Sequence, residues 1–159
     1  MKPKFHLFLS FLAAIVLASS ISAADIKPTA EAGHTHAKKT AGPNGGRVIE
    51  GIEPRAEFFV TPERKVQITF LAKDDTPITP DAQNVAVTAG ERTAPTRLTF
   101  AKTGNVLLSN AALPAGNDFP VVVEITPAPG GKKVLDKFYF DSAQCSECKH
   151  AEYACICEH

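Results

Sequence analysis

The central part of the chain alternates apolar and polar residues with a period of two, which is the pattern of a half-buried β-strand. Residues 65–70 read Lys-Val-Gln-Ile-Thr-Phe, and in 121–126 the apolar residues Val121, Val123 and Ile125 again occupy alternate positions. Shorter apolar bursts rich in valine, leucine and phenylalanine occur at 85–87, 98–100, 106–108 and 138–140. The pattern therefore predicts a series of short strands.

Turn residues separate these strands at short intervals. The clearest turns are Pro77–Pro80, Thr103–Asn105 and Pro127–Gly131, and Asn44-Gly45 precedes a further strand that begins near Arg47. Short strands with frequent turns are typical of antiparallel sandwiches. We therefore expect an all-β domain over residues 47–141, an antiparallel β-sandwich of the immunoglobulin-like type, with its phenylalanines in the core.

The first 24 residues have the pattern of a secretory leader. Lys2 and Lys4 precede an apolar run from Leu7 to Ile21, and Ser22-Ala23-Ala24 ends it with small residues. This order of a basic, an apolar and a small-residue region predicts a signal peptide cleaved after Ala24. We therefore expect a periplasmic or secreted protein that is not held in the membrane after cleavage.

Residues 25–46 contain glycine, proline, alanine and threonine with few apolar side chains, and this composition predicts a flexible linker. Within it, His34 and His36 form a His-x-His pair. Two imidazoles with this spacing can hold copper(II), zinc or nickel, but they bind weakly on a flexible segment. We therefore rank the pair below the tail as a candidate metal site.

The last segment, residues 142–159, holds all four cysteines of the chain. Cys145 and Cys148 form a Cys-x-x-Cys pair, whose short turn aims both sulfurs at one ion. Cys155 and Cys157 are spaced i, i+2, and an extended backbone places both side chains on one face. His150 and His159 are additional ligand candidates. Thiolates and imidazoles favour zinc or copper(I), so the tail is predicted to bind one of these ions.

Two disulfide bonds are the main alternative, because cysteines of exported proteins are usually oxidised. Nested Cys145–Cys157 and Cys148–Cys155 bonds would close the tail, and in that case no metal would bind. We favour the metal because the four cysteines are confined to one short segment, where disulfides would cross-link little of the fold. A redox Cys-x-x-Cys motif would need a βαβ context, which the strand pattern does not provide.

The segment His34 to Ile49 contains the histidine pair followed by Gly-Pro-Asn-Gly-Gly-Arg-Val. It resembles the Gly-Pro-His-Gly-Gly-Arg type of segment found in some periplasmic adaptor subunits of heavy-metal efflux pumps and in their small relatives. Asn44 stands where that family has a histidine, and the long coiled-coil hairpin of a full adaptor is missing. The resemblance implies an exported protein that handles zinc, copper or similar ions, with a component of a periplasmic metal-efflux system as its partner.

The composition narrows the function further. The formal net charge of the chain is zero and no basic run is present, which disfavours nucleic acid as a partner. The predicted sandwich contains no histidine, and the chain lacks a nucleophile elbow, a P-loop and a dinucleotide-binding fingerprint, so we expect no enzymatic activity. The leading hypothesis is an exported metal chaperone, buffer or efflux accessory. The alternative is a disulfide-stabilised structural or interaction protein without metal.

Overall fold

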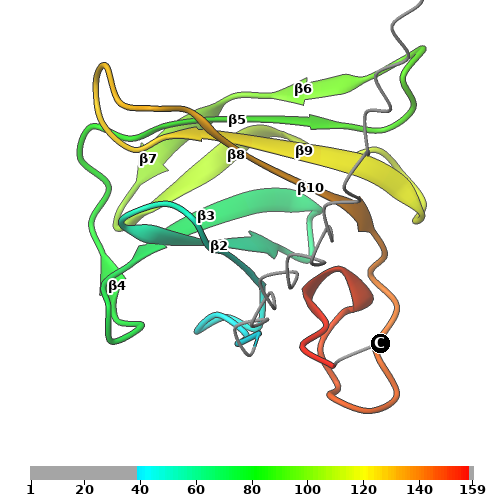
Figure 1. Cartoon of the computed structure of the whole chain (residues 1–159). Coiled ribbons are helices and arrows are strands. Elements are labelled where there is room, and N and C mark those ends of the chain that lie inside the picture. Colours follow the sequence, from blue (N-terminus) through cyan, green and yellow to red (C-terminus); the bar gives the residue numbers. More distant parts are fainter. Residues whose placement is uncertain (1–38, 158–159) are drawn as a thin grey trace, which may run out of the picture. The chain divides into compact units, whose positions relative to one another are not determined.

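The computed structural model of the chain describes residues 39–157. The predicted leader, the His34/His36 pair and His159 lie outside these residues. Within them, two antiparallel sheets pack face to face and a short tail lies at one end (Figure 1). The prediction of an all-β sandwich is therefore confirmed, while the immunoglobulin-like type stays a prediction.

The first sheet has the strand order β1-β2-β3-β8-β7, with β4 paired to β3. Its strands are β1 (Arg47–Ile49), β2 (Arg55–Val60), β3 (Lys65–Leu71), β4 (Pro77–Ile78), β7 (Phe100–Thr103) and β8 (Val106–Ala112). The second sheet has the order β10-β9-β5-β6. Its strands are β5 (Asn84–Ala89), β6 (Thr96–Leu98), β9 (Phe119–Thr126) and β10 (Val134–Phe140).

The period of two accounts for the strands that form the core. Val66, Ile68 and Phe70 of β3 are completely buried, and β9 buries every second residue along its length. The burst at 98–100 is two strands: β6 ends at Leu98 in one sheet, and β7 begins at Phe100 in the other. The predicted turn at Pro77–Pro80 contains the short strand β4. Crossings between sheets depend on long-range pairing, which local alternation does not encode.

The end of the core nearest the tail is aromatic. Phe58 of β2 meets the ring of Phe138 edge-on at 5.2 Å, and Phe119 stacks on Phe140 at 5.1 Å, both measured between ring centroids. Such pairs contribute about 0.5–1.5 kcal/mol beyond the area they bury. Because β10 ends with Phe140, the chain leaves this aromatic cluster directly into the cysteine-containing tail.

The Gly42–Gly46 loop is held by a buried carboxylate. Glu57 of β2 is completely buried and accepts hydrogen bonds from the backbone amides of Asn44 (2.9 Å) and Gly46 (2.8 Å). The side-chain amide of Asn44 donates a third bond, of 2.7 Å, to the same carboxylate. A buried carboxylate needs such partners to offset its desolvation. The Gly42–Gly46 loop, which precedes the predicted start of the sandwich at Arg47, is therefore packed against the first sheet.

Two glycines of this loop are required by close approach. A Cβ atom at Gly42 would lie 2.4 Å from the Glu57 carboxyl carbon, and one at Gly46 would lie 2.4 Å from the Phe58 carbonyl oxygen. Real Cβ atoms do not come this close to other atoms. The glycines that carry the resemblance to the efflux adaptors therefore have a packing role in this chain.

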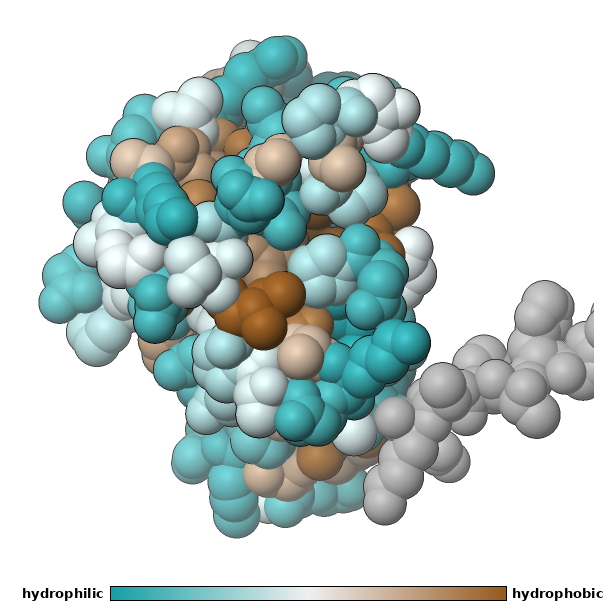
Figure 2. Space-filling model, turned by 90° about the vertical axis from the view of Figure 1, so that its left-hand side faces the viewer, coloured by the Kyte–Doolittle hydropathy of each residue, from teal (hydrophilic) through white to brown (hydrophobic). Residues whose placement is uncertain are grey.

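One face of the molecule is shown in Figure 2. That face, at the β4 end of the sandwich, is largely hydrophilic, with a small apolar patch near its centre and further apolar atoms toward its rim (Figure 2). Between residues 39 and 157, no helix is both long and apolar enough to cross a bilayer.

We predict that Glu57→Ala lowers the free energy of unfolding by about 2–4 kcal/mol, because the amides of Asn44 and Gly46 lose a charged acceptor. Glu57→Gln should lose less, since its carbonyl oxygen still accepts from both amides. Urea denaturation measures these differences. Glu63→Ala, at an exposed position in the β2–β3 turn, is the control and should leave stability unchanged. Equal stability of Glu57→Ala and the unsubstituted chain would contradict the role of this carboxylate.

Candidate metal centre

The tail after β10 folds back on itself as a tight loop. Gln144 and Ala151 form an isolated antiparallel bridge, and the Cys145 amide donates to the His150 carbonyl oxygen at 2.8 Å. The Lys149 amide donates to the Cys145 carbonyl oxygen at 3.2 Å, and Lys149 has a positive φ of 66°. This turn brings the two sulfurs of the Cys-x-x-Cys pair to the same side, which is the geometry of a metal-binding knuckle.

A single turn of 3-10 helix, η1 (Glu152–Ala154), then attaches the tail to the sandwich. Tyr153 is 94% buried, and its ring stacks on Phe140 at 5.2 Å between centroids. Its hydroxyl oxygen accepts a hydrogen bond of 3.1 Å from the Val60 amide at the end of β2. The amide of Tyr153 donates to the Asp141 carbonyl oxygen at 3.0 Å. The tail is therefore held by the aromatic core as well as by its own loop.

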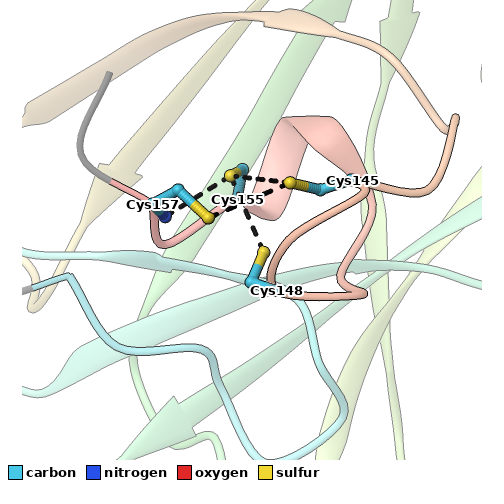
Figure 3. A group of neighbouring side chains, drawn as sticks. All are labelled: Cys145, Cys148, Cys155 and Cys157. Carbon is cyan, nitrogen blue, oxygen red and sulfur yellow. Dashed lines mark hydrogen bonds between the residues drawn. The ribbon is translucent and has the colours of Figure 1, made fainter.

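The four cysteine sulfurs converge beside η1 (Figure 3). The Sγ atom of Cys155 lies 3.6 Å from that of Cys145 and 3.7 Å from that of Cys148. Cys145 and Cys157 are 3.9 Å apart between sulfurs, and all four sulfurs lie within 4.8 Å of one another. A disulfide bond would need about 2.05 Å, so none joins these residues in the structure.

Backbone amides around the cluster favour a thiolate at Cys148. Its pKa is lowered to about 6, chiefly by a hydrogen bond from the Ile156 amide, with a smaller contribution from the His150 amide. The pKa of Cys157 is raised, first by desolvation and then by the neighbouring Cys155. Four sulfurs this close cannot all be ionised without a cation, because like charges raise one another's pKa.

Cys155 has a more balanced environment. The Cys157 amide donates to its sulfur at 3.4 Å and is the largest influence on its pKa, in the lowering direction. Desolvation and the Cys145 and Cys148 side chains outweigh this amide, so the pKa of Cys155 is raised overall. In the metal-free cluster, the first proton is therefore lost from Cys148.

The histidines that the sequence offered as ligands are not part of the cysteine cluster in the described part of the chain. His150 supplies backbone groups to the knuckle, but its imidazole does not join the group of ligand atoms formed by the four sulfurs. Its Nδ1 atom instead faces Gly45, where an added Cβ would lie 3.5 Å away. His159, His34 and His36 lie outside the described residues. The structure thus brings together Cys145, Cys148, Cys155 and Cys157.

One side of the cluster is open to a surface cavity. Cys155 and Ile156 line a space of about 240 Å³ together with Leu135 and with Arg47 and Asp136, which form an ion pair of 2.8 Å. Cys145 is buried, whereas the other three cysteines are partly exposed. The cluster is therefore reachable from solvent while its geometry is fixed by the fold.

Sequence reasoning missed the elements that orient the cluster. It did not anticipate η1, the burial of Tyr153 or the amides of Ile156 and His150. The one available signal was Tyr153 itself, a lone aromatic residue between the two cysteine pairs. Such a residue in a short polar tail needs a place to bury its ring.

Comparison of the chain with protein-family models, with curated proteins and with solved structures found no match. The proposals on function that follow are therefore based on the residues and the geometry of the tail.

We predict that in the reduced, metal-free protein Cys148 is alkylated first by iodoacetamide, with a rate that reaches half its maximum near pH 6. Cys155 and Cys157 should react only at higher pH, because their pKa values are raised. Peptide mass mapping after short labelling pulses identifies the modified residue. In guanidinium chloride all four cysteines should react alike, near their ordinary pKa of about 8.5. Faster labelling of Cys157 than of Cys148 at neutral pH would contradict this order.

Proposed function

We propose that the protein is an exported metal-binding protein that holds one zinc or copper(I) ion through its four cysteines. The observation that supports this most strongly is the spacing of the sulfurs. Four thiolates around zinc at the usual Zn–S length of 2.3 Å lie about 3.8 Å apart along the edges of a tetrahedron. Three of the sulfur–sulfur distances in the cluster, 3.6, 3.7 and 3.9 Å, bracket this value.

The donor set favours zinc as the first candidate. Four sulfur ligands in a tetrahedral arrangement are typical of zinc, and copper(I), which also prefers soft thiolates, is the second candidate. Zinc with four thiolates carries a net charge of −2. Amide donors at Cys148 and Cys155 spread part of this charge onto the backbone. The same donors favour thiolates over thiols, and binding requires thiolates.

Loading of the site follows from its protonation. Near pH 7, Cys148 is a thiolate and provides the first ligand, because its pKa is about 6. Cys155 and Cys157 are thiols at that pH, since their pKa values are raised, and they must release protons as the ion binds. Affinity should therefore rise with pH and fall as the solution is acidified.

A role as a carrier or buffer fits the attachment of the tail better than a purely structural role. Structural zinc ions commonly fold segments that lack a core of their own. Here Tyr153 and Ala154 are buried in the hydrophobic core, which holds the tail independently of the cluster. Three of the four cysteines remain partly exposed, which gives a partner access to the ion. We propose a periplasmic metal chaperone, buffer or efflux accessory.

A catalytic role is disfavoured by the same ligand count. Catalytic zinc sites have three protein ligands and keep one position open for water or substrate. Four converging cysteines fill every position of a tetrahedral ion and leave none for a reactant. The proposal is therefore binding and transfer of the ion, with no chemistry performed on a substrate.

We predict that the reduced protein binds one equivalent of zinc and that a variant with Cys155→Ser and Cys157→Ser does not. The variant keeps only two of the four converging sulfurs, which are too few for tight binding. Isothermal titration calorimetry and elemental analysis of the dialysed protein measure the stoichiometry.

The matched control is His150→Ala, which should bind zinc as the unsubstituted chain does, because the imidazole is outside the sulfur group. Undiminished binding by the double-serine variant would exclude the site. So would recovery, from its native compartment, of a protein whose four cysteines are joined as two disulfides.

We also predict that chelation of the metal leaves the tail in place. The Val60 amide donates to the Tyr153 hydroxyl, so its hydrogen exchange reports tail attachment. Exchange at Val60 should be similar in the zinc-loaded and chelated protein, and much faster in Tyr153→Ala, which loses both the stacking and the acceptor. If chelation accelerates this exchange as much as Tyr153→Ala does, the metal is a structural element and the carrier role is wrong.

A further inference from the structure

A second cavity, of about 570 Å³, lies beside the knuckle. Its walls come from three segments: the Gly42–Gly46 loop, the turn between β2 and β3, and the tail from Ser142 to Tyr153. Phe59, Phe140 and Tyr153 supply apolar surface to it. Its volume lies within the usual range of ligand-binding pockets.

The two charged side chains of this cavity are both basic. Arg64 and Lys149 line it together with the His150 side chain, and no acidic side chain is among the described residues of its lining. The chain as a whole has no net charge, with equal numbers of basic and acidic residues. A cavity with only one sign of charge is therefore a local feature, and it attracts anionic groups.

Arg64 is a fixed part of the wall. Its Nη2 atom donates to the carbonyl oxygens of Pro114 and Gly116, and its guanidinium carbon lies 5.4 Å from the centre of the Phe140 ring. Its Nε atom is buried without a hydrogen-bond partner. These contacts hold one positive charge at the cavity, where a carboxylate would compensate it.

Lys149 and His150 connect the cavity to the cysteine cluster. The His150 amide donates to the Cys148 sulfur, and the His150 carbonyl oxygen accepts from the Cys145 amide. Lys149 adopts a positive φ of 66°, as Arg64 does with 60°. Non-glycine residues rarely hold this conformation unless the surrounding structure requires it. A ligand that contacts Lys149 and His150 therefore touches the turn that positions Cys148.

We infer that this cavity is the docking site for an acidic peptide segment of the protein with which the cysteine cluster exchanges its metal. The inference rests on the proposed function for the identity of the partner. Carboxylate side chains of the segment would pair with Lys149 and accept a hydrogen bond from the His150 imidazole, and its apolar side chains would contact Phe59. A segment seated there brings the partner's own metal ligands next to Cys148, the partly exposed cysteine of the knuckle.

The transfer itself is a ligand exchange. A donor atom of the partner forms a bond to the ion as the bond from the ion to the Cys148 sulfur breaks, and Cys148 leaves as a thiolate. No electrons are transferred, and no oxidant or reductant is needed.

Nuclear magnetic resonance of the full, zinc-loaded chain, labelled with nitrogen-15, tests the docking site. The probe is a short synthetic peptide of alternating glutamate and serine, and the same peptide with lysine replacing glutamate is its control. The acidic peptide should shift the amide resonances of Asn44, Thr61, Lys149 and His150, and salt should weaken its binding. The basic peptide should shift none of them.

Lys149→Glu should weaken binding of the acidic peptide about tenfold, because an attractive charge becomes a repulsive one. Lys149→Asn, which tolerates the positive φ at this position, removes the charge without adding repulsion and should weaken binding less. The control is Lys73→Glu, an equal charge change in the exposed turn that precedes β4, at the opposite end of the sandwich from the tail (Figure 1). It should bind as the unsubstituted chain does.

Three results would overturn the inference: resonance shifts on another face, equal binding by Lys149→Glu and the unsubstituted chain, or equal weakening by Lys149→Glu and Lys73→Glu. Failure of the proposed function gives a different pattern. A chain that binds no zinc but still binds the acidic peptide at Lys149 retains the docking site and loses the metal role. A chain that binds zinc and ignores the peptide retains the metal role and loses the docking site.

Discussion

Burial of the Tyr153 ring against Phe140 and Phe58 is the contact on which the rest of the tail depends. Without it, a short segment with four cysteines would have to order itself through sulfur chemistry alone. With it, the aromatic end of the sandwich supplies the free energy that places η1, and η1 fixes Cys155 and Cys157 opposite the knuckle. Hydrophobic packing offsets the conformational entropy lost when the segment becomes ordered, so binding of an ion would not also have to fold the segment.

Because packing orders the tail separately from the sulfurs, the proposed exchange of an ion is affected. A site whose geometry survives removal of the ion can lose and regain it without passing through an unfolded tail. Preorganisation raises affinity because the entropy of ordering is already lost, and partial exposure of three cysteines keeps a route open for a competing ligand. The arrangement therefore suits the proposed carrier role, which requires both tight holding and ready transfer of an ion.

The sequence alone predicted the sandwich and a cluster of the four cysteines, because strand alternation and the spacing within each cysteine pair are short-range patterns. Period-two alternation located the core residues of β3 and β9, and the Cys-x-x-Cys and Cys-x-Cys pairs each specify the direction of their own side chains. What the sequence did not predict depends on contacts between distant segments. Three features are of this kind: the sheet crossing between Leu98 and Phe100, the packing of Tyr153 on β10, and the orientation of the His150 imidazole toward Gly45. Local patterns cannot supply them, because a periodic strand has no preferred partner until the whole sheet is assembled.

The packing of the Gly42–Gly46 loop predicts how related sequences should vary at these positions. Its glycines leave room for the Glu57 side chain, so loop and carboxylate form one packing unit divided between two distant parts of the sequence. A chain that replaces the acid with a smaller residue is released from the need for glycine at position 42, whereas glycine at position 46 is still required by the Phe58 carbonyl oxygen. Among related sequences, positions 42 and 57 should therefore change together, and a shared glycine pattern here records a common architecture before it records a common ion.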